Sequence, residues 1–230
     1  MRWLTLRLAR AGDSALLVEF EERIDLRIAA RGAALADALD AMHLVGVRDV
    51  VPTFRTVAVY FDPLEADATT IVQAIEQLLR QAVTSTRVSR PPIEIPVCYG
   101  GDFGPDLPRV AEFGGVSEAE VVELHSAVIY HVMMLGFMPG FAYMGAVDPR
   151  IAAPRLDSPR QHVARGSVGI AKEQTGIYPG DTPGGWQVIG RAPVRPFDMS
   201  RPDPFLFRAG DEVRFVPIGS EEFERLDRAS

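Results

Sequence analysis

The sequence contains one cysteine, Cys98, among its 230 residues, so no internal disulfide framework can form. Aspartate and glutamate (31) outnumber lysine and arginine (24), and the net charge of −7 argues against a nucleic-acid binder, which needs a basic face. No window approaches the roughly 18 consecutive apolar residues of a membrane span. The N-terminus also lacks the apolar stretch of a signal peptide. These absences predict a cytoplasmic protein without a membrane or nucleic-acid partner.

Familiar catalytic and nucleotide-binding motifs are missing as well. The sequence has no G-x-x-x-x-G-K-[ST] loop for phosphates and no G-x-S-x-G turn for a hydrolase serine. His125 and His131 stand six residues apart, which is not the spacing of a metal site, and Cys98 is isolated. We therefore expect no metal and no self-contained active site of a common type.

The first eighty or so residues show the periodicities of a small α+β unit. Leucines alternate with polar residues at positions 4–8, as in a half-buried strand, and residues 15–20 follow a turn as its hairpin partner. Apolar residues recur at helical spacing from Leu26 to Met42 and again after Asp67, a residue type that caps helices. Residues 57–61 alternate as another strand. We expect two helices on one face of a small antiparallel sheet.

The composition changes after residues 83–92, a polar stretch ending in two prolines that is typical of a boundary between domains. Of the 20 glycines, 17 lie from Gly100 onward. Ser117 and Glu120 have the spacing of a capping box, which predicts a helix ending near His125. The remainder consists of short apolar runs between glycine and proline turns, a pattern typical of a barrel or sandwich.

Four glycine-rich segments of this half are candidates for a binding site: residues 97–107, 135–145, 165–179 and 182–193. Glycine lets backbone amides approach a ligand closely, and proline limits the entropy lost on binding. Aromatic side chains of these segments could line a pocket. Tight barrel corners with buried aromatics produce the same pattern without a ligand, so the residues alone leave both interpretations open.

Five long phrases stand out in the second half: IPVCYGGDFGPDL, LGFMPGFAYMG, DPRIAAPR, GSVGIAKEQTGIYP and PGGWQVIGRAP. They resemble the signature segments of a bacterial family, the KipI / PxpB family, whose PxpB members are the B subunits of 5-oxoprolinase and were formerly called allophanate hydrolase subunit 1. The order and spacing match from about Ile95 to Ile218. The resemblance implies an α+β fold, with a small N-terminal α+β subdomain, residues 1–85, followed by a C-terminal cyclophilin-like β-barrel, residues 86–230.

The resemblance also implies a function. Members pair with a homologous cyclophilin-like subunit (PxpC or KipA), and with a PxpA-like subunit they hydrolyse the lactam 5-oxo-L-proline to L-glutamate at the expense of ATP. The chain alone is expected to be inactive, and its sequence assigns no ATP site. Two alternatives remain: a KipI-type inhibitor of a sensor histidine kinase, and a subunit related to allophanate hydrolase or to the carboxyltransferase region of urea carboxylase.

Site residues follow from the same resemblance. His125 and Arg191 are the predicted catalytic groups, although His125 at a helix end also complements the helix dipole, and Arg191 could simply pair with a carboxylate. The predicted substrate-binding or interface residues form three walls: Phe137, Pro139, Gly140, Phe141 and Tyr143; Gln174, Thr175 and Tyr178; and Gly184, Gly185 and Trp186.

Overall fold

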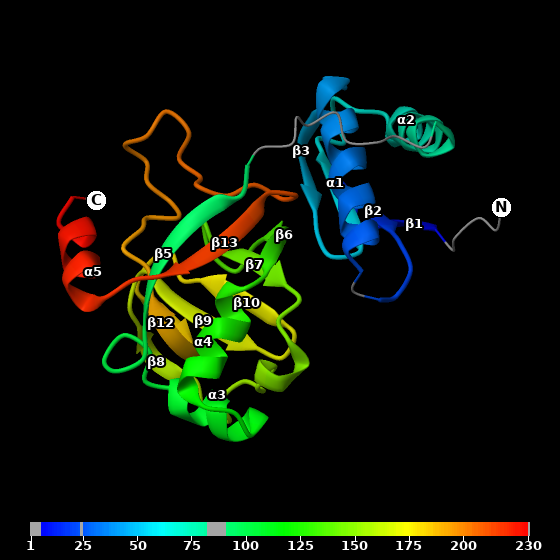
Figure 1. Ribbon diagram of the computed structural model, residues 1–230. Coiled ribbons are helices and arrows are strands. Elements are labelled where there is room, and N and C mark those ends of the chain that lie inside the picture. Colours follow the sequence, from blue (N-terminus) through cyan, green and yellow to red (C-terminus); the bar gives the residue numbers. More distant parts are fainter. Residues whose placement is uncertain (1–5, 24, 82–90, 230) are drawn as a thin grey trace. The chain divides into compact units, whose positions relative to one another are not determined.

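The computed structural model describes residues 6–23, 25–81 and 91–229 (Figure 1). The chain divides into two compact units, residues 1–89 and 90–230. The predicted boundary, residues 83–92, lies outside the described residues except for Pro91 and Pro92. Each unit has its own hydrophobic core.

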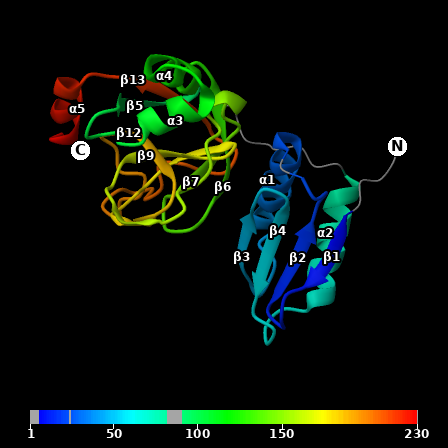
Figure 2. The ribbon, with the colours of Figure 1, turned by 90° about the horizontal axis from the view of Figure 1, so that it is seen from below.

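The N-terminal unit is a four-stranded antiparallel sheet in the order β1-β2-β4-β3, and Figure 2 shows these strands side by side. The strands are β1 (Arg7–Arg10), β2 (Ala15–Glu19), β3 (Val47–Pro52) and β4 (Thr56–Phe61). The predicted strands at residues 15–20 and 57–61 are confirmed. Strand β3 was not predicted, because it lies at the sheet edge and its exposed Arg48 and Asp49 interrupt the alternation of apolar residues.

Two helices pack on one face of this sheet, as predicted. They are α1 (Leu26–Ala41) and α2 (Ala68–Arg80), which contact each other and share one core with the strands. Each begins at an aspartate whose carboxylate accepts a hydrogen bond from the second residue of the helix: Asp25 from Arg27 at 2.8 Å and Asp67 from Thr69 at 2.9 Å. These bonds satisfy backbone donors that a helix start leaves free.

The C-terminal unit contains a closed seven-stranded barrel in the order β10-β7-β6-β13-β5-β12-β9, which confirms the predicted α+β fold with a barrel. Its strands are β5 (Ile93–Tyr99), β6 (Ile129–Leu135), β7 (Ala142–Gly145), β9 (Ser167–Ala171), β10 (Gln174–Ile177), β12 (Gln187–Arg191) and β13 (Glu212–Pro217). Strands β5 and β13 pair in parallel, and the other neighbours are antiparallel. Closure lets such short strands pair along both edges.

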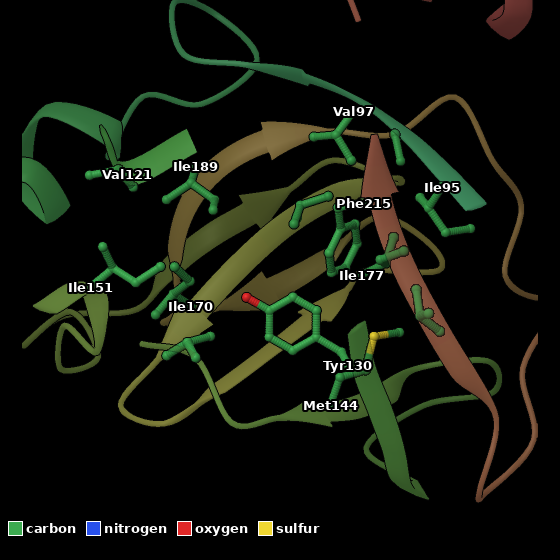
Figure 3. Close-up of a cluster of buried hydrophobic side chains, with 14 of the residues drawn as sticks. Ile95, Val97, Val121, Tyr130, Met144, Ile151, Ile170, Ile177, Ile189 and Phe215 are labelled. Atoms are coloured by element: carbon green, nitrogen blue, oxygen red, sulfur yellow. The ribbon is translucent and has the colours of Figure 1, made fainter. Parts of the chain in front are cut away.

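Apolar side chains fill the barrel, so it is a packed core rather than a pore. Figure 3 shows side chains from several strands meeting inside it, among them Ile95, Tyr130, Ile170, Ile177 and Phe215. All five are almost completely buried. Successive residues of a strand point to opposite faces, so the inward positions of β9, β10 and β12 leave the alternate residues on the outer surface of the barrel.

Short helices and a two-stranded ribbon surround the barrel. The helices are α3 (Leu107–Gly114), α4 (Glu118–Ser126), η1 (Pro149–Ile151) and α5 (Ser220–Asp227), and the ribbon pairs β8 (Arg160–Val163) with β11 (Thr182–Gly184). The capping box at α4 is confirmed, because the Ser117 amide donates to the Glu120 carboxylate at 2.8 Å and the Glu120 amide donates to the Ser117 hydroxyl at 3.2 Å. Helices α3 and α5 were not predicted. No helix formed by the described residues is long and apolar enough to cross a bilayer.

Candidate functional site

Four aromatic side chains pack together on the outside of the barrel, and we call them the outer aromatic cluster: Phe141, Tyr143, Tyr178 and Trp186. The ring centroid of Phe141 lies 4.8 Å from Tyr143 and 5.3 Å from both Tyr178 and Trp186. All three contacts are edge-to-face, the arrangement favoured by the ring quadrupoles. The structure therefore brings together residues from all three predicted walls.

Glycines in the barrel strands and in the β8–β11 ribbon make room for these rings. A Cβ on Gly176 would lie 3.2 Å from the Phe141 ring, and one on Gly169 would lie 3.1 Å from the Cβ of Trp186. At Gly184 the space is smaller, since a Cβ there would lie 2.5 Å from the Tyr178 hydroxyl. The glycine pattern seen in the sequence thus serves ring-on-backbone packing at these positions.

Most of the cluster is a second, smaller core. Phe141 and Tyr178 are 2% exposed and Trp186 is 4% exposed. Burial raises the pKa of the Tyr178 hydroxyl and, at the half-buried rim, that of Tyr143. For the three buried rings, the interpretation as core aromatics at a barrel corner accounts for the sequence pattern. Their part in binding a substrate stays a prediction.

Phe137 is the exposed member of the predicted first wall. The residue is 61% exposed, and its ring centroid lies 5.5 Å from that of Phe141. Its backbone has φ of 67°, a left-handed conformation that costs a residue with a Cβ about 1–2 kcal/mol. The loop is held by Gly140, at φ 85°, where a Cβ would lie 2.7 Å from that of Phe197; Pro139 lies between them. The fold thus presents a large apolar ring to solvent on a fixed loop.

Arg155 covers the cluster, and the sequence reasoning missed it. Its guanidinium carbon lies 5.9 Å from the centroid of the Trp186 ring. The residues on either side are held in place: the Pro154 carbonyl accepts a 2.8 Å hydrogen bond from the Gln187 side chain, and the Leu156 amide donates to the Gly185 carbonyl at 2.7 Å. The available signal was its position at the end of the phrase DPRIAAPR, which carried no assigned role.

Asp106 and Arg160 form a second polar contact beside the cluster. One Asp106 oxygen accepts from Arg160 at 2.6 Å, and the other accepts from the Val188 amide at 2.6 Å. The carboxylate is buried, so both partners are needed to offset the cost of removing it from water. This pair fixes the β8–β11 ribbon against β12, and it too was not singled out from the sequence.

His125 lies inside the barrel rather than at the outer cluster. It is 0% exposed and stacks on Phe215 with ring centroids 4.6 Å apart. The Tyr99 hydroxyl is 2.8 Å from Nδ1 and the Thr175 hydroxyl 2.8 Å from Nε2, and Thr175 in turn donates to the Gly169 carbonyl at 3.0 Å. This donor order places the proton on Nε2, so both nitrogens of a neutral imidazole are satisfied. Burial lowers the pKa of His125 to about 3.

Arg191 lies at the opposite end of β12 from Trp186, five residues along the strand, which corresponds to roughly 16 Å. Its Nε donates to the Arg165 carbonyl at 2.9 Å, and its guanidinium carbon lies 5.8 Å from the Phe223 ring of α5. The two predicted catalytic groups therefore share no contact: His125 bonds to Tyr99 and Thr175 inside the barrel, and Arg191 contacts Arg165 and Phe223. Of the remaining predicted residues, Gln174 is half-buried at the start of β10, and Gly185 borders the cluster beside Trp186. The catalytic assignments stay predictions.

The two-unit fold and the barrel with its covered outer face define a recognised class of domain. Residues 6–207 match the family described as carboxyltransferase domain, subdomain C and D. Among its relatives, the chain is 39% identical to the 5-oxoprolinase B subunit of Bacillus subtilis, over 97% of this chain and 98% of that protein. It is 42% identical to the 5-oxoprolinase B subunit of Escherichia coli O157:H7, over 90% and 93%. The chain belongs to this family, the B subunits of 5-oxoprolinase.

Solved structures share the fold of this chain. The protein TTHA0988 superposes with a TM-score of 0.83 at 34% identity over 90% of this chain, although the chain covers only 40% of that longer protein. A conserved uncharacterized protein from Pyrococcus horikoshii is 43% identical over 94% of this chain and 100% of its own, with a TM-score of 0.57. Urea amidolyase of K. lactis shares the fold, with a TM-score of 0.75 at 21% identity, and the chain covers 15% of it.

Proposed function

We propose that this chain is the PxpB component of an ATP-dependent 5-oxoprolinase, which hydrolyses 5-oxo-L-proline to L-glutamate together with PxpC-like and PxpA-like subunits. The proposal rests on the similarity to proteins named as the B subunits of 5-oxoprolinase. The sequence identity is 39% and 42%, over nearly the full length of this chain and of each relative. At 97% of this chain, the match to the Bacillus subtilis protein spans both units.

The chemistry explains why ATP is needed. A five-membered lactam is a stabilised amide, and its carbonyl carbon is a poor electrophile. Transfer of the γ-phosphoryl group of ATP to the carbonyl oxygen would yield ADP and an activated carbon. Water would then add to that carbon and the C–N bond would break, which frees the amine and leaves an acyl phosphate. A second water would hydrolyse the acyl phosphate to the carboxylate of glutamate and inorganic phosphate. A site for this reaction requires hydrogen-bond donors directed at the oxygen on which charge develops.

We further propose that the Phe137 loop contacts the homologous cyclophilin-like partner subunit. An exposed aromatic ring on a strained but fixed loop is a typical anchor residue of a protein interface. The outer cluster beneath it is already packed, so a partner could bury the Phe137 ring without first ordering the loop. On this proposal the isolated chain has only part of the active site.

A second candidate function is supported by more distant relatives. The chain is 24% identical to urea amidolyase of Saccharomyces cerevisiae over 94% of its length and 13% of that protein. A carboxyltransferase-type reaction on a urea-like substrate is therefore the alternative within the enzyme class. The higher sequence identity to the 5-oxoprolinase relatives favours a lactam over a urea-like compound as the substrate.

Glutamate release from 5-oxo-L-proline and ATP tests the proposal. The assay combines this chain with the PxpC-like and PxpA-like proteins of the same genome and omits each in turn, and a parallel series replaces the lactam with urea. We expect release of glutamate and phosphate that disappears when this chain is left out. No glutamate from three folded subunits, or undiminished release without this chain, would overturn the proposal. Turnover of urea alone would support the second candidate.

A further inference from the structure

Arg155 is a cation without an anionic partner at the surface of the outer aromatic cluster. Among the residues that the structure describes, no carboxylate lies within 4.0 Å of its guanidinium nitrogens. The nearby Arg160 is paired with Asp106, and Arg150 of the same phrase is paired with Asp148 at 2.9 Å. Arg155 is thus an exposed arginine without an ion pair beside two arginines that have one.

The fold holds this arginine in position. The loop is fixed at three points on either side of Arg155. The Ala153 carbonyl accepts from the Lys172 amide at 2.7 Å, and Pro154 and Leu156 make the contacts with Gln187 and Gly185 described above. Contact with the Trp186 ring orients the guanidinium further. Little conformational entropy remains to be lost on binding, so the outward edge of the guanidinium is a preorganised receptor for an oxyanion.

The surroundings favour a small anion attached to a compact apolar group. Arg155 acts electrostatically on the hydroxyls of Tyr143 and Tyr178, whose pKa values it lowers against the larger raising effect of burial. Tyr143 lies at the half-buried rim, and its ring centroid is 5.8 Å from that of Trp186. A carboxylate matches the planar fork of arginine with two parallel hydrogen bonds, while the aromatic rim suits a small hydrocarbon ring.

We propose that Arg155, held over Trp186, binds the carboxylate of the lactam substrate and thereby selects a carboxylate-bearing ring over neutral amides. This inference rests on the proposed function and adds the residue that determines its specificity. The substrate 5-oxo-L-proline carries a carboxylate at neutral pH, whereas 2-pyrrolidinone, the same ring without it, and urea do not. An arginine placed in this way would also bind a phosphate of ATP. The experiment must therefore distinguish binding of the substrate carboxylate from binding of ATP.

Steady-state kinetics of the assembled three-subunit complex tests this role. The main variant is Arg155→Met, which keeps an unbranched stem to cover Trp186 but removes the charge; Arg155→Lys keeps the charge but not the fork. We expect Arg155→Met to raise KM for 5-oxo-L-proline about 10- to 100-fold, as for loss of a charge-assisted bidentate contact, and Arg155→Lys to raise it less. KM for ATP and turnover of 2-pyrrolidinone should stay within about twofold of wild type.

Arg150→Gln is the matched control, because Arg150 is an exposed arginine of the same phrase whose partner is Asp148. It should leave both KM values unchanged. Unchanged KM for 5-oxo-L-proline in Arg155→Met, with an active wild-type complex, would overturn the role of Arg155 and leave the proposed function standing. A rise confined to KM for ATP would overturn it as well, by assigning Arg155 to phosphate. An inactive wild-type complex would instead reject the proposed function itself.

Discussion

The imidazole of His125 and the hydroxyl of Thr175, which are 50 residues apart in the sequence, meet at 2.8 Å inside the barrel. The Thr175 hydroxyl donates in turn to the Gly169 carbonyl, and the Tyr99 hydroxyl donates to the other ring nitrogen of His125. The network joins helix α4 to strands β5, β9 and β10, so a residue predicted to be catalytic fastens the helix to the barrel.

Replacing Thr175 with valine should destabilise the protein by about 1–3 kcal/mol. Valine has nearly the same shape, but it leaves the His125 Nε2–H and the Gly169 carbonyl buried without their partner. Chemical denaturation of the isolated chain measures the change. Thr182→Val is the control, because the Thr182 hydroxyl makes only an exposed 3.3 Å contact and its loss should cost less than about 0.5 kcal/mol. Equal effects of both changes would contradict the network.

The buried His125 should make the protein less stable as the pH falls below 6.5. Its pKa is about 3 in the folded chain and 6.5 when it is solvated, so between these values the unfolded chain binds one more proton. Above pH 6.5 His125 is neutral in both states and costs no stability. Below pH 6.5 the free energy of unfolding falls, with a limiting slope of about 1.4 kcal/mol per pH unit from this residue. Urea denaturation at several pH values should show this slope in wild type and a shallower one in His125→Gln. Identical slopes would mean that His125 titrates normally.

Replacing Phe137 with glycine should weaken binding of the cyclophilin-like partner by about tenfold or more while leaving the fold intact. Glycine stabilises the fold by about 1 kcal/mol because it relieves the left-handed backbone, and it destabilises the fold by about 1 kcal/mol because the ring contact with Phe141 is lost. The two effects on the free energy of unfolding therefore nearly cancel. Titration calorimetry with the partner measures the affinity. Phe113→Ala, which removes another exposed phenylalanine of the same unit, is the control. Unchanged affinity in Phe137→Gly would show that the loop lies outside the interface.

The two adjacent glycines before Trp186 should respond differently to alanine. In Gly184→Ala the new Cβ would lie 2.5 Å from the Tyr178 hydroxyl, so the packed cluster must shift at a cost of about 1–3 kcal/mol. In Gly185→Ala it would meet only Pro159, at an ordinary 3.6 Å, and we expect a change below about 0.5 kcal/mol. Thermal unfolding of the two variants checks the contrast. The reverse order would falsify the packing described for the cluster.

Much of the fold could be predicted because its signals are local. The caps at Asp67 and Ser117 depend on residues two or three positions away, and the alternation in β2 and β4 reports one buried face. Strand β3 and helices α3 and α5 were missed because they are short or lie at an edge, where tertiary contacts outweigh the weak periodicity of the sequence.

The candidate site was predicted only in part. The phrases in the sequence indicated the aromatic residues and their glycines, and the structure brings Phe141, Tyr178 and Trp186 into contact. Their burial could not be predicted, because it depends on how the ribbon and the loop before it cover the barrel. Arg155 was overlooked for the same reason, since its significance lies in what Gln187 and Gly185 hold it against.

The sequence by itself determined the two-part α+β organisation, the family, and the segments in which the site must be sought, because periodicity, caps and long irregular phrases are properties of the chain. Only the tertiary structure decided on which side of the barrel wall each residue lies. In a closed barrel, neighbouring residues face opposite sides, so Thr175 points to the buried His125 while Tyr178, three residues later, joins the outer cluster. Trp186 directly precedes β12 and Arg191 ends it, so the length of the strand separates them.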